Sequence, residues 1–169
     1  MKNLLHLKQH VKYPHVVKSI VEIPKDTNVK YEYDVESGLM KLDRCLISSL
    51  QYPASYGFIP NTLSEDGDPT DILIYNTVPL HPMTLVEVKV LGSLITYDSG
   101  KKDPKIIGVP LFNPNKYENI SQLDSMFLTI VEDFFRIYKK QKGKKNPVKI
   151  KGWLNNIETK KYLMKYKQF

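Results

Sequence analysis

Among its 169 residues the chain has a single cysteine, Cys45. One cysteine excludes a disulfide framework and a thiolate metal cluster. Its apolar neighbours predict that it is buried and unreactive. No apolar run approaches the length that a bilayer-spanning helix needs. The stretch MKNLLHLKQH at residues 1–10 is too short in its apolar part, and too interrupted by charge, for a signal peptide. We therefore expect a cytoplasmic protein that does not enter a membrane.

Several common catalytic signatures are also missing. The sequence has no GxSxG elbow, no P-loop and no GxGxxG motif. Its histidines lack the spacing of metal ligands, and we interpret them as ordinary polar or packing residues: His6, His10, His15 and His81. If the chain is an enzyme, its chemistry has to come from other residue types.

Charge is unevenly placed along the chain, whose formal net charge is +7. Residues 136–169 hold 12 of the 25 lysines and arginines and only one acid, Glu158, so the first 135 residues are net acidic. A uniform nucleic-acid binder does not usually show this division. A solvated lysine-rich face is the simpler interpretation of the basic C-terminal region.

Length and patterning predict one domain, residues 1–169, with a core of its own. Short β-forming segments fill the first two thirds and return near the end, with Gly92 marking a bulge: 15–23, 30–35, 39–44, 71–76, 85–97, 105–110 and 148–153. Helical spacing of apolar residues predicts a helix that begins near Ser121, with Asp124 as capping partner, and stops near Gly143. A final helix is expected over 157–167. The pattern predicts an α+β fold that is mainly β, a small barrel or strongly curved sheet with helices packed outside.

The most unusual stretch is SEDGDPTDILIY, residues 64–75, where Asp66, Asp68 and Asp71 lie within six residues. Clustered carboxylates become favourable when a hard divalent cation cancels their repulsion. The spacing does not fit an EF-hand loop, because the sixth position is Asp71 rather than glycine and the twelfth is Thr77 rather than glutamate. An acidic surface turn explains the cluster equally well when it is taken alone.

Further carboxylates follow or lie on other predicted strands: Glu22, Glu32, Asp98 and Asp103. Each could simply face solvent. If several strands instead deliver them to one cavity, the cavity suits magnesium, which keeps several waters and is usually completed by substrate phosphates.

Phosphate also needs cations and hydrogen-bond donors. Arg44 is the only arginine in the first 135 residues, and its fork could bind phosphate or pair with Asp43. The other candidates are lysines and tyrosines: Lys30, Lys105, Lys139, Tyr52, Tyr56 and Tyr138. Two of these tyrosines lie in QYPASYGFIP, which we predict to be a loop, and they could equally be packing residues.

Taken together, these segments resemble the soluble (family I) inorganic pyrophosphatases. DGDPTDI is similar to that family's metal-binding signature. The segments VEIP, KYEYD, LDR, YPASYGFIP, DSGKKDPK, FFRIYKKQKGK and VKIKGW follow in the family's order, over roughly residues 15–155. Lys101 and Lys102 are a departure, because they place extra cations between Asp98 and Asp103.

The resemblance implies a five-stranded OB-type barrel that hydrolyses pyrophosphate to two phosphates with several Mg²⁺ ions, in a homo-oligomer. It implies metal ligands at Asp66, Asp71, Asp103 and Asp98, with Glu22 and Glu32 lining the metal cavity. It implies Asp68 as general base and Tyr52 as a tyrosine close to the reacting groups. The phosphate contacts that it implies are Lys30, Arg44, Tyr56, Lys105, Tyr138 and Lys139. Of these, it implies that Lys30, Arg44 and Tyr56 are also catalytic.

The main alternative is a nucleic-acid-binding barrel of the OB type that uses the basic C-terminal region. It explains the lysines but not the carboxylates, so we do not expect nucleic acid to be the partner. A calcium-binding structural domain is disfavoured by the failed loop pattern.

Overall fold

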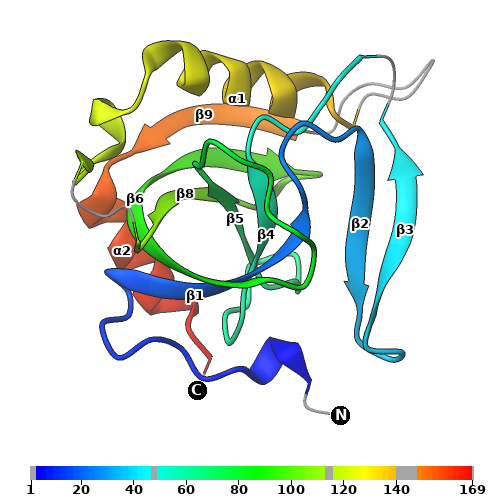
Figure 1. The fold of residues 1–169 in the computed structure, drawn as a ribbon. Coiled ribbons are helices and arrows are strands. Elements are labelled where there is room, and N and C mark those ends of the chain that lie inside the picture. Colours follow the sequence, from blue (N-terminus) through cyan, green and yellow to red (C-terminus); the bar gives the residue numbers. More distant parts are fainter. Residues whose placement is uncertain (1–2, 47–48, 113–115, 140–147, 169) are drawn as a thin grey trace.

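A computed structural model describes residues 3–46, 49–112, 116–139 and 148–168. Five of its strands close into a barrel, because the chain of neighbours β1-β4-β5-β8-β6 is completed by pairing between β1 and β6 (Figure 1). These strands are β1 (Val16–Ile23), β4 (Ser55–Ile59), β5 (Thr70–Ile74), β6 (Leu85–Asp98) and β8 (Lys105–Pro110). The expected mainly-β architecture with a small five-stranded barrel is confirmed.

Glycine lets two of these strands approach closely. A Cβ on Gly57 of β4 would lie 1.9 Å from the Ile20 carbonyl oxygen of β1, so a larger residue cannot stand there without moving the backbone. In β6 the register with β8 shifts between Val90 and Gly92, which confirms the expected bulge. The close approach at Gly57 and the bulge in β6 both help the sheet to close.

The remaining strands extend the barrel or stand beside it. β7 (Lys101–Lys102) and β9 (Val148–Leu154) both pair antiparallel with β6. β2 (Val29–Asp34) and β3 (Leu39–Cys45) form a separate antiparallel hairpin beside the barrel (Figure 1). Gly38 in the hairpin turn has φ of 72°, a conformation that glycine adopts at little cost.

Two α-helices cover the outside, α1 (Ser125–Ile137) and α2 (Asn156–Tyr166), together with the short 3₁₀ helices η1 (Leu4–His6) and η3 (Ile120–Gln122). The predicted start of α1 at Ser121 was wrong. Ser121 lies in η3, and Asp124 is the N-cap, accepting from the Met126 amide at 2.8 Å. Extended backbone at Leu123 separates η3 from α1. The expected stop at Gly143 falls outside the described residues.

Two apolar clusters hold the helices to the sheet. The first contains Phe134 and Phe135 of α1 with Tyr52, Tyr56 and other buried residues of the barrel. The second contains Tyr162 and Leu163 of α2 with buried valines and isoleucines of the barrel strands. Burial of apolar area on both sides is the main stabilising contribution.

Two local predictions are corrected. The segment predicted as a loop, QYPASYGFIP, contains β4, every residue of which is buried. Its prolines, Pro53 and Pro60, flank the strand rather than interrupt it. Cys45 is exposed rather than buried, because it ends β3 of the two-stranded hairpin and not a core strand.

Candidate active site

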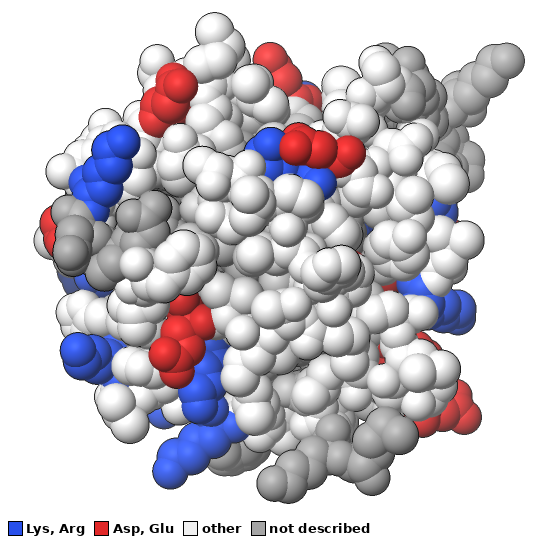
Figure 2. All heavy atoms as spheres, in the orientation of Figure 1, with Lys and Arg blue, Asp and Glu red and all other residues white. Residues whose placement is uncertain are grey.

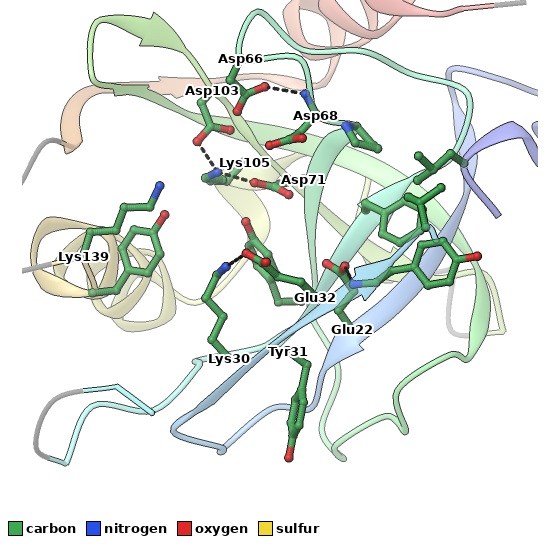
Figure 3. Close-up of a pocket in the computed structure, with 17 residues that line it drawn as sticks. Glu22, Lys30, Tyr31, Glu32, Asp66, Asp68, Asp71, Asp103, Lys105 and Lys139 are labelled. Carbon is green, nitrogen blue, oxygen red and sulfur yellow. Dashed lines mark hydrogen bonds and ion pairs between the residues drawn. The ribbon is translucent and has the colours of Figure 1, made fainter. Parts of the chain in front are cut away.

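A cavity of about 290 Å³ lies between the barrel and the β2–β3 hairpin. Its walls carry six carboxylates and three lysines: Glu22, Glu32, Asp66, Asp68, Asp71, Asp103, Lys30, Lys105 and Lys139. In Figure 3 the aspartates gather around Lys105, while Lys30 and Lys139 extend toward them from other elements. Segments far apart in the sequence thus deliver acids and cations to one space.

A tight turn places two of the aspartates. The Ser64 amide donates to the Asp68 carbonyl at 2.8 Å, and the Gly67 amide donates to the Ser64 carbonyl at 3.1 Å. Gly67 has φ of 98°, which only glycine adopts readily. The Asp68 amide donates to Asp66 Oδ1 at 3.1 Å. Asp71 follows on β5, so the strand continues the acidic wall that the turn begins.

Lys105 is the buried centre of the site. Its Nζ lies 2.5 Å from Asp71 Oδ2 and 2.6 Å from Asp103 Oδ2, and its side chain is only 2% exposed. Burial alone would lower the pKa of Lys105, but the two carboxylates outweigh it and raise that pKa well above its ordinary value. The lysine is therefore charged and bridges carboxylates from β5 and from the segment before β8.

The β2–β3 hairpin closes another side of the cavity. Lys30 pairs with Glu32 on the same strand, and its Nζ lies 3.0 Å from Asp43 Oδ2 of β3. Arg44 stands opposite Lys30 in the hairpin and pairs with the same Asp43 oxygen at 3.0 Å. Asp43 thus holds two cations next to each other at the edge of the site.

Tyr138 and Lys139 enter from the end of α1. Tyr138 is buried and packs on Phe134, with ring centroids 5.4 Å apart. Lys139 forms an ion pair with Asp98 at the end of β6. Partial burial opposes ionisation of Asp98, but this lysine lowers the pKa of the carboxyl overall. The pair ties the end of α1 to the barrel beside the cavity.

The cavity wall disfavours negative charge in the absence of a cation. Burial raises the pKa of Glu22 to about 8, against an opposing hydrogen bond from the Tyr33 amide. Burial also raises the pKa of Asp103 to about 6, and Lys105 only partly opposes it. The pKa of Asp68 is raised by partial burial and by the neighbouring Asp66 and Asp71. These shifts describe a site that gains from binding a cation.

Comparison with known proteins decides the family. The inorganic pyrophosphatase family model matches residues 19–168. The chain is 41% identical to an inorganic pyrophosphatase of Sulfolobus acidocaldarius, over 87% of each chain. The crystal structure of an inorganic pyrophosphatase from Thermus thermophilus superimposes with a TM-score of 0.90 and 38% identity, covering 96% of this chain and 95% of that one. The chain belongs to the inorganic pyrophosphatase family. It is thus a hydrolase of the diphosphatase class.

Most of the residues predicted for this pyrophosphatase family site meet in the cavity. All of them line it except Tyr52, Asp98 and Arg44, which lie behind or beside it. Asp98 reaches the site through its ion pair with Lys139, and Arg44 through Asp43. Tyr52 is buried beneath it, and its hydroxyl has no hydrogen-bond partner among the described residues. The individual roles assigned to all these residues stay predictions.

Sequence reasoning missed the apolar part of the lining: Leu5, Tyr31, Tyr33, Val35, Phe58 and Pro69. Leu5 arrives because its carbonyl accepts from the Asn61 amide at 2.6 Å, a contact that no local motif signals. Tyr33 stacks on Phe58 with ring centroids 6.0 Å apart. Alternation along β2 does not signal Tyr31 and Tyr33, because they flank Glu32 and alternation assigns them to the opposite face of the strand.

The donor set fits the metal cofactor that the family implies. Carboxylate oxygens are the ligands that Mg²⁺ prefers, and acids exceed cations in the wall. Among the residues that the structure describes, no three acidic, histidine or cysteine side chains already converge as a ligand set. Lys105 stands between Asp71 and Asp103, and the other acids are spread along the cavity. This spacing suits an ion that completes its shell with water and substrate oxygens.

Proposed function

We propose that this protein hydrolyses inorganic pyrophosphate to two phosphates in a Mg²⁺-dependent reaction. One observation carries the proposal beyond family membership: a single cavity combines an acidic wall with three lysines and is also lined by Tyr56 and Tyr138. An acidic wall without cations would repel a diphosphate. Lysines alone could bind a diphosphate, but that would leave the six carboxylates unexplained. Together they suit a polyanion that binds with divalent cations.

Asp66, Asp71 and Asp103 are the proposed principal Mg²⁺ ligands, with Asp98, Glu22 and Glu32 supporting further ions. Bound Mg²⁺ would supply charge neutralisation and Lewis acidity. Lys30, Lys139 and Arg44, with Lys105, Tyr56 and Tyr138, orient the phosphates and stabilise charge on the leaving phosphate. The lysines stay charged because burial effects are outweighed by nearby acids, which raises the pKa of Lys30 and of Lys105.

Asp68 is the proposed general base. It stands on the exposed side of the turn, next to Asp66, and is not part of the ion pairs around Lys105. Its raised pKa makes it a better proton acceptor than an ordinary aspartate. It takes the proton of the attacking water as the bridging P–O bond breaks, and the departing phosphate carries the electron pair of that bond.

The test is phosphate release from pyrophosphate by purified protein, with millimolar-scale Mg²⁺ and with EDTA. Release that depends on Mg²⁺ and stops with EDTA supports the proposal. Folded protein that releases no phosphate with Mg²⁺ refutes it. On the one face drawn in Figure 2, lysines and arginines are scattered among acids rather than gathered in one patch.

We further propose one domain over residues 1–169, a homo-oligomeric assembly and a cytoplasmic location. The family model spans residues 19–168, which supports a single domain. Exposed apolar residues on one face of α1 support self-association: Met126, Ile130 and Ile137. Light scattering on a sizing column measures the assembly. No helix within the described ranges is long and apolar enough to cross a membrane.

A further inference from the structure

The basic C-terminal region meets the segment that leads into the aspartate turn. The Leu63 amide donates to the Tyr166 carbonyl at 3.0 Å, and the Gln168 amide donates to the Asn61 carbonyl at 2.9 Å. Thr62 and Lys167 form an isolated antiparallel bridge between these contacts. The end of α2 therefore holds the residues immediately before Glu65 by its backbone.

Glu65 adds two side-chain contacts at the start of the turn. Its Oε1 accepts from the Tyr166 hydroxyl at 2.7 Å, and its Oε2 accepts from the Lys102 amide at 3.0 Å. Both oxygens are engaged, and Glu65 does not belong to the cavity lining. Lys102 directly precedes Asp103, and Glu65 directly precedes Asp66. The Glu65 carboxylate therefore links α2, through Tyr166, and β7, through Lys102, to the turn that carries Asp66.

The turn needs such support, because Glu65, Gly67 and Asp68 are all exposed. Little packing holds them, and the charges on Asp66 and Asp68 repel each other. A tether at Glu65 restricts how far Asp66 moves from Asp103. Groups that hydrogen-bond a metal ligand directly typically contribute about 10- to 100-fold to metal affinity, and Glu65 acts one residue further from the ligand.

We propose that Glu65 and Tyr166 are positioning residues that hold Asp66 next to Asp103 and so preorganise the cavity for Mg²⁺. The inference rests on the proposed function only in taking these two aspartates as Mg²⁺ ligands. It assigns α2 a role in positioning Asp66 that does not depend on the lysines of the C-terminal region.

The experiment measures Mg²⁺ affinity by calorimetry, without pyrophosphate, in the wild type and in two variants. Glu65→Ala removes both contacts and should raise the Kd for Mg²⁺ about tenfold, the lower end of that range. Tyr166→Phe removes one hydroxyl and should raise the Kd about threefold, because the Lys102 contact survives. Glu65→Gln keeps one carbonyl oxygen as acceptor and should fall between Glu65→Ala and the wild type.

Tyr13→Phe is the matched control. The Tyr13 hydroxyl donates to the Leu163 carbonyl at 2.6 Å, so this change also removes a tyrosine hydrogen bond to α2, but not the one to Glu65. It should lower the melting temperature and leave the Kd for Mg²⁺ unchanged. An equal loss of affinity in Tyr13→Phe would overturn the proposal, since any weakening of α2 would then suffice.

Unchanged Mg²⁺ affinity in both Glu65→Ala and Tyr166→Phe would also overturn it. If Glu65→Ala does not fold, Tyr166→Phe alone decides.

Phosphate release separates this inference from the proposed function. A wild-type protein that binds Mg²⁺ but releases no phosphate refutes pyrophosphate hydrolysis. The Mg²⁺ titrations of the variants still test whether Glu65 and Tyr166 position Asp66. When hydrolysis holds, kcat of Tyr166→Phe at saturating Mg²⁺ should stay within about twofold of the wild type, as expected when only ligand positioning is affected.

Discussion

Replacing Lys105 with methionine tests the buried centre of the site. Methionine keeps an unbranched stem of similar length, so packing against Phe135, whose ring centroid lies 5.7 Å from the lysine Nζ, changes little. The charge, however, disappears from between Asp71 and Asp103. Without metal, these two carboxylates then lack their shared partner in a poorly solvated space.

The expected loss of stability is large. The Lys105 side chain is 2% exposed and that of Asp103 is 7% exposed. Removing one partner of a buried ion pair typically costs about 3–5 kcal/mol. For a protein of this size, that corresponds to a decrease of about 6–20 °C in melting temperature.

The loss should depend on pH and on metal. The pKa of Asp103, already raised to about 6 by burial despite Lys105, rises further when the lysine is gone. A carboxyl group whose folded-state pKa is raised destabilises the fold as pH rises through that pKa. The deficit should therefore be greater at pH 8 than at pH 6. Mg²⁺ should stabilise the variant more than the wild type, because the ion can take the place of the ammonium group.

Thermal unfolding followed by circular dichroism, in EDTA and then in Mg²⁺ at both pH values, measures all three effects. Lys101→Met is the control, since it removes the same charge from an exposed position. A melting temperature for Lys105→Met within about 2 °C of the control at pH 8 in EDTA, which is below 1 kcal/mol, would refute the reasoning about the buried ion pair.

Three further predictions concern single side chains. Glu22→Gln should stabilise the metal-free protein at pH 8 more than at pH 5, because the raised pKa of Glu22, about 8, makes the ionised form costly only as pH rises. Arg44→Lys should lower kcat/KM at least about tenfold, or about 1.4 kcal/mol, by losing the guanidinium fork. Asp71→Asn should weaken Mg²⁺ binding and recover partly with added Mg²⁺, whereas Asp68→Asn should bind the first Mg²⁺ nearly normally and turn over about a hundredfold more slowly.

Each of these three predictions has a result that would contradict it. A stability difference between Glu22→Gln and the wild type that is equal at both pH values would show that the pKa of Glu22 is not raised in the folded protein. Wild-type kinetics in folded Arg44→Lys would make the pair with Asp43 purely structural. If calorimetry shows that Asp68→Asn loses the first Mg²⁺ site while Asp71→Asn keeps it, the two roles are inverted.

The sequence by itself determined most strands and the residue types of the site. Alternation marked β2, and β-branched content marked β1, because such residues pack well on the pleated surface of a sheet. It misjudged β4, because the prolines at its ends are as typical of a loop as of a strand boundary. It misplaced the start of α1, because Ser121 and Asp124 have the spacing of a cap although the intervening turn is a 3₁₀ helix.

Only the tertiary structure decided how these residues meet. Pairing of β4 with both β1 and β5 brings Glu22 near Asp71, and the parallel pairing of β5 with β8 sets Lys105 between Asp71 and Asp103. The tether from Glu65 to Tyr166 joins positions 101 residues apart. Local sequence records which side chains are available, but contacts across such separations depend on strand register and helix packing, which arise only when the whole core forms.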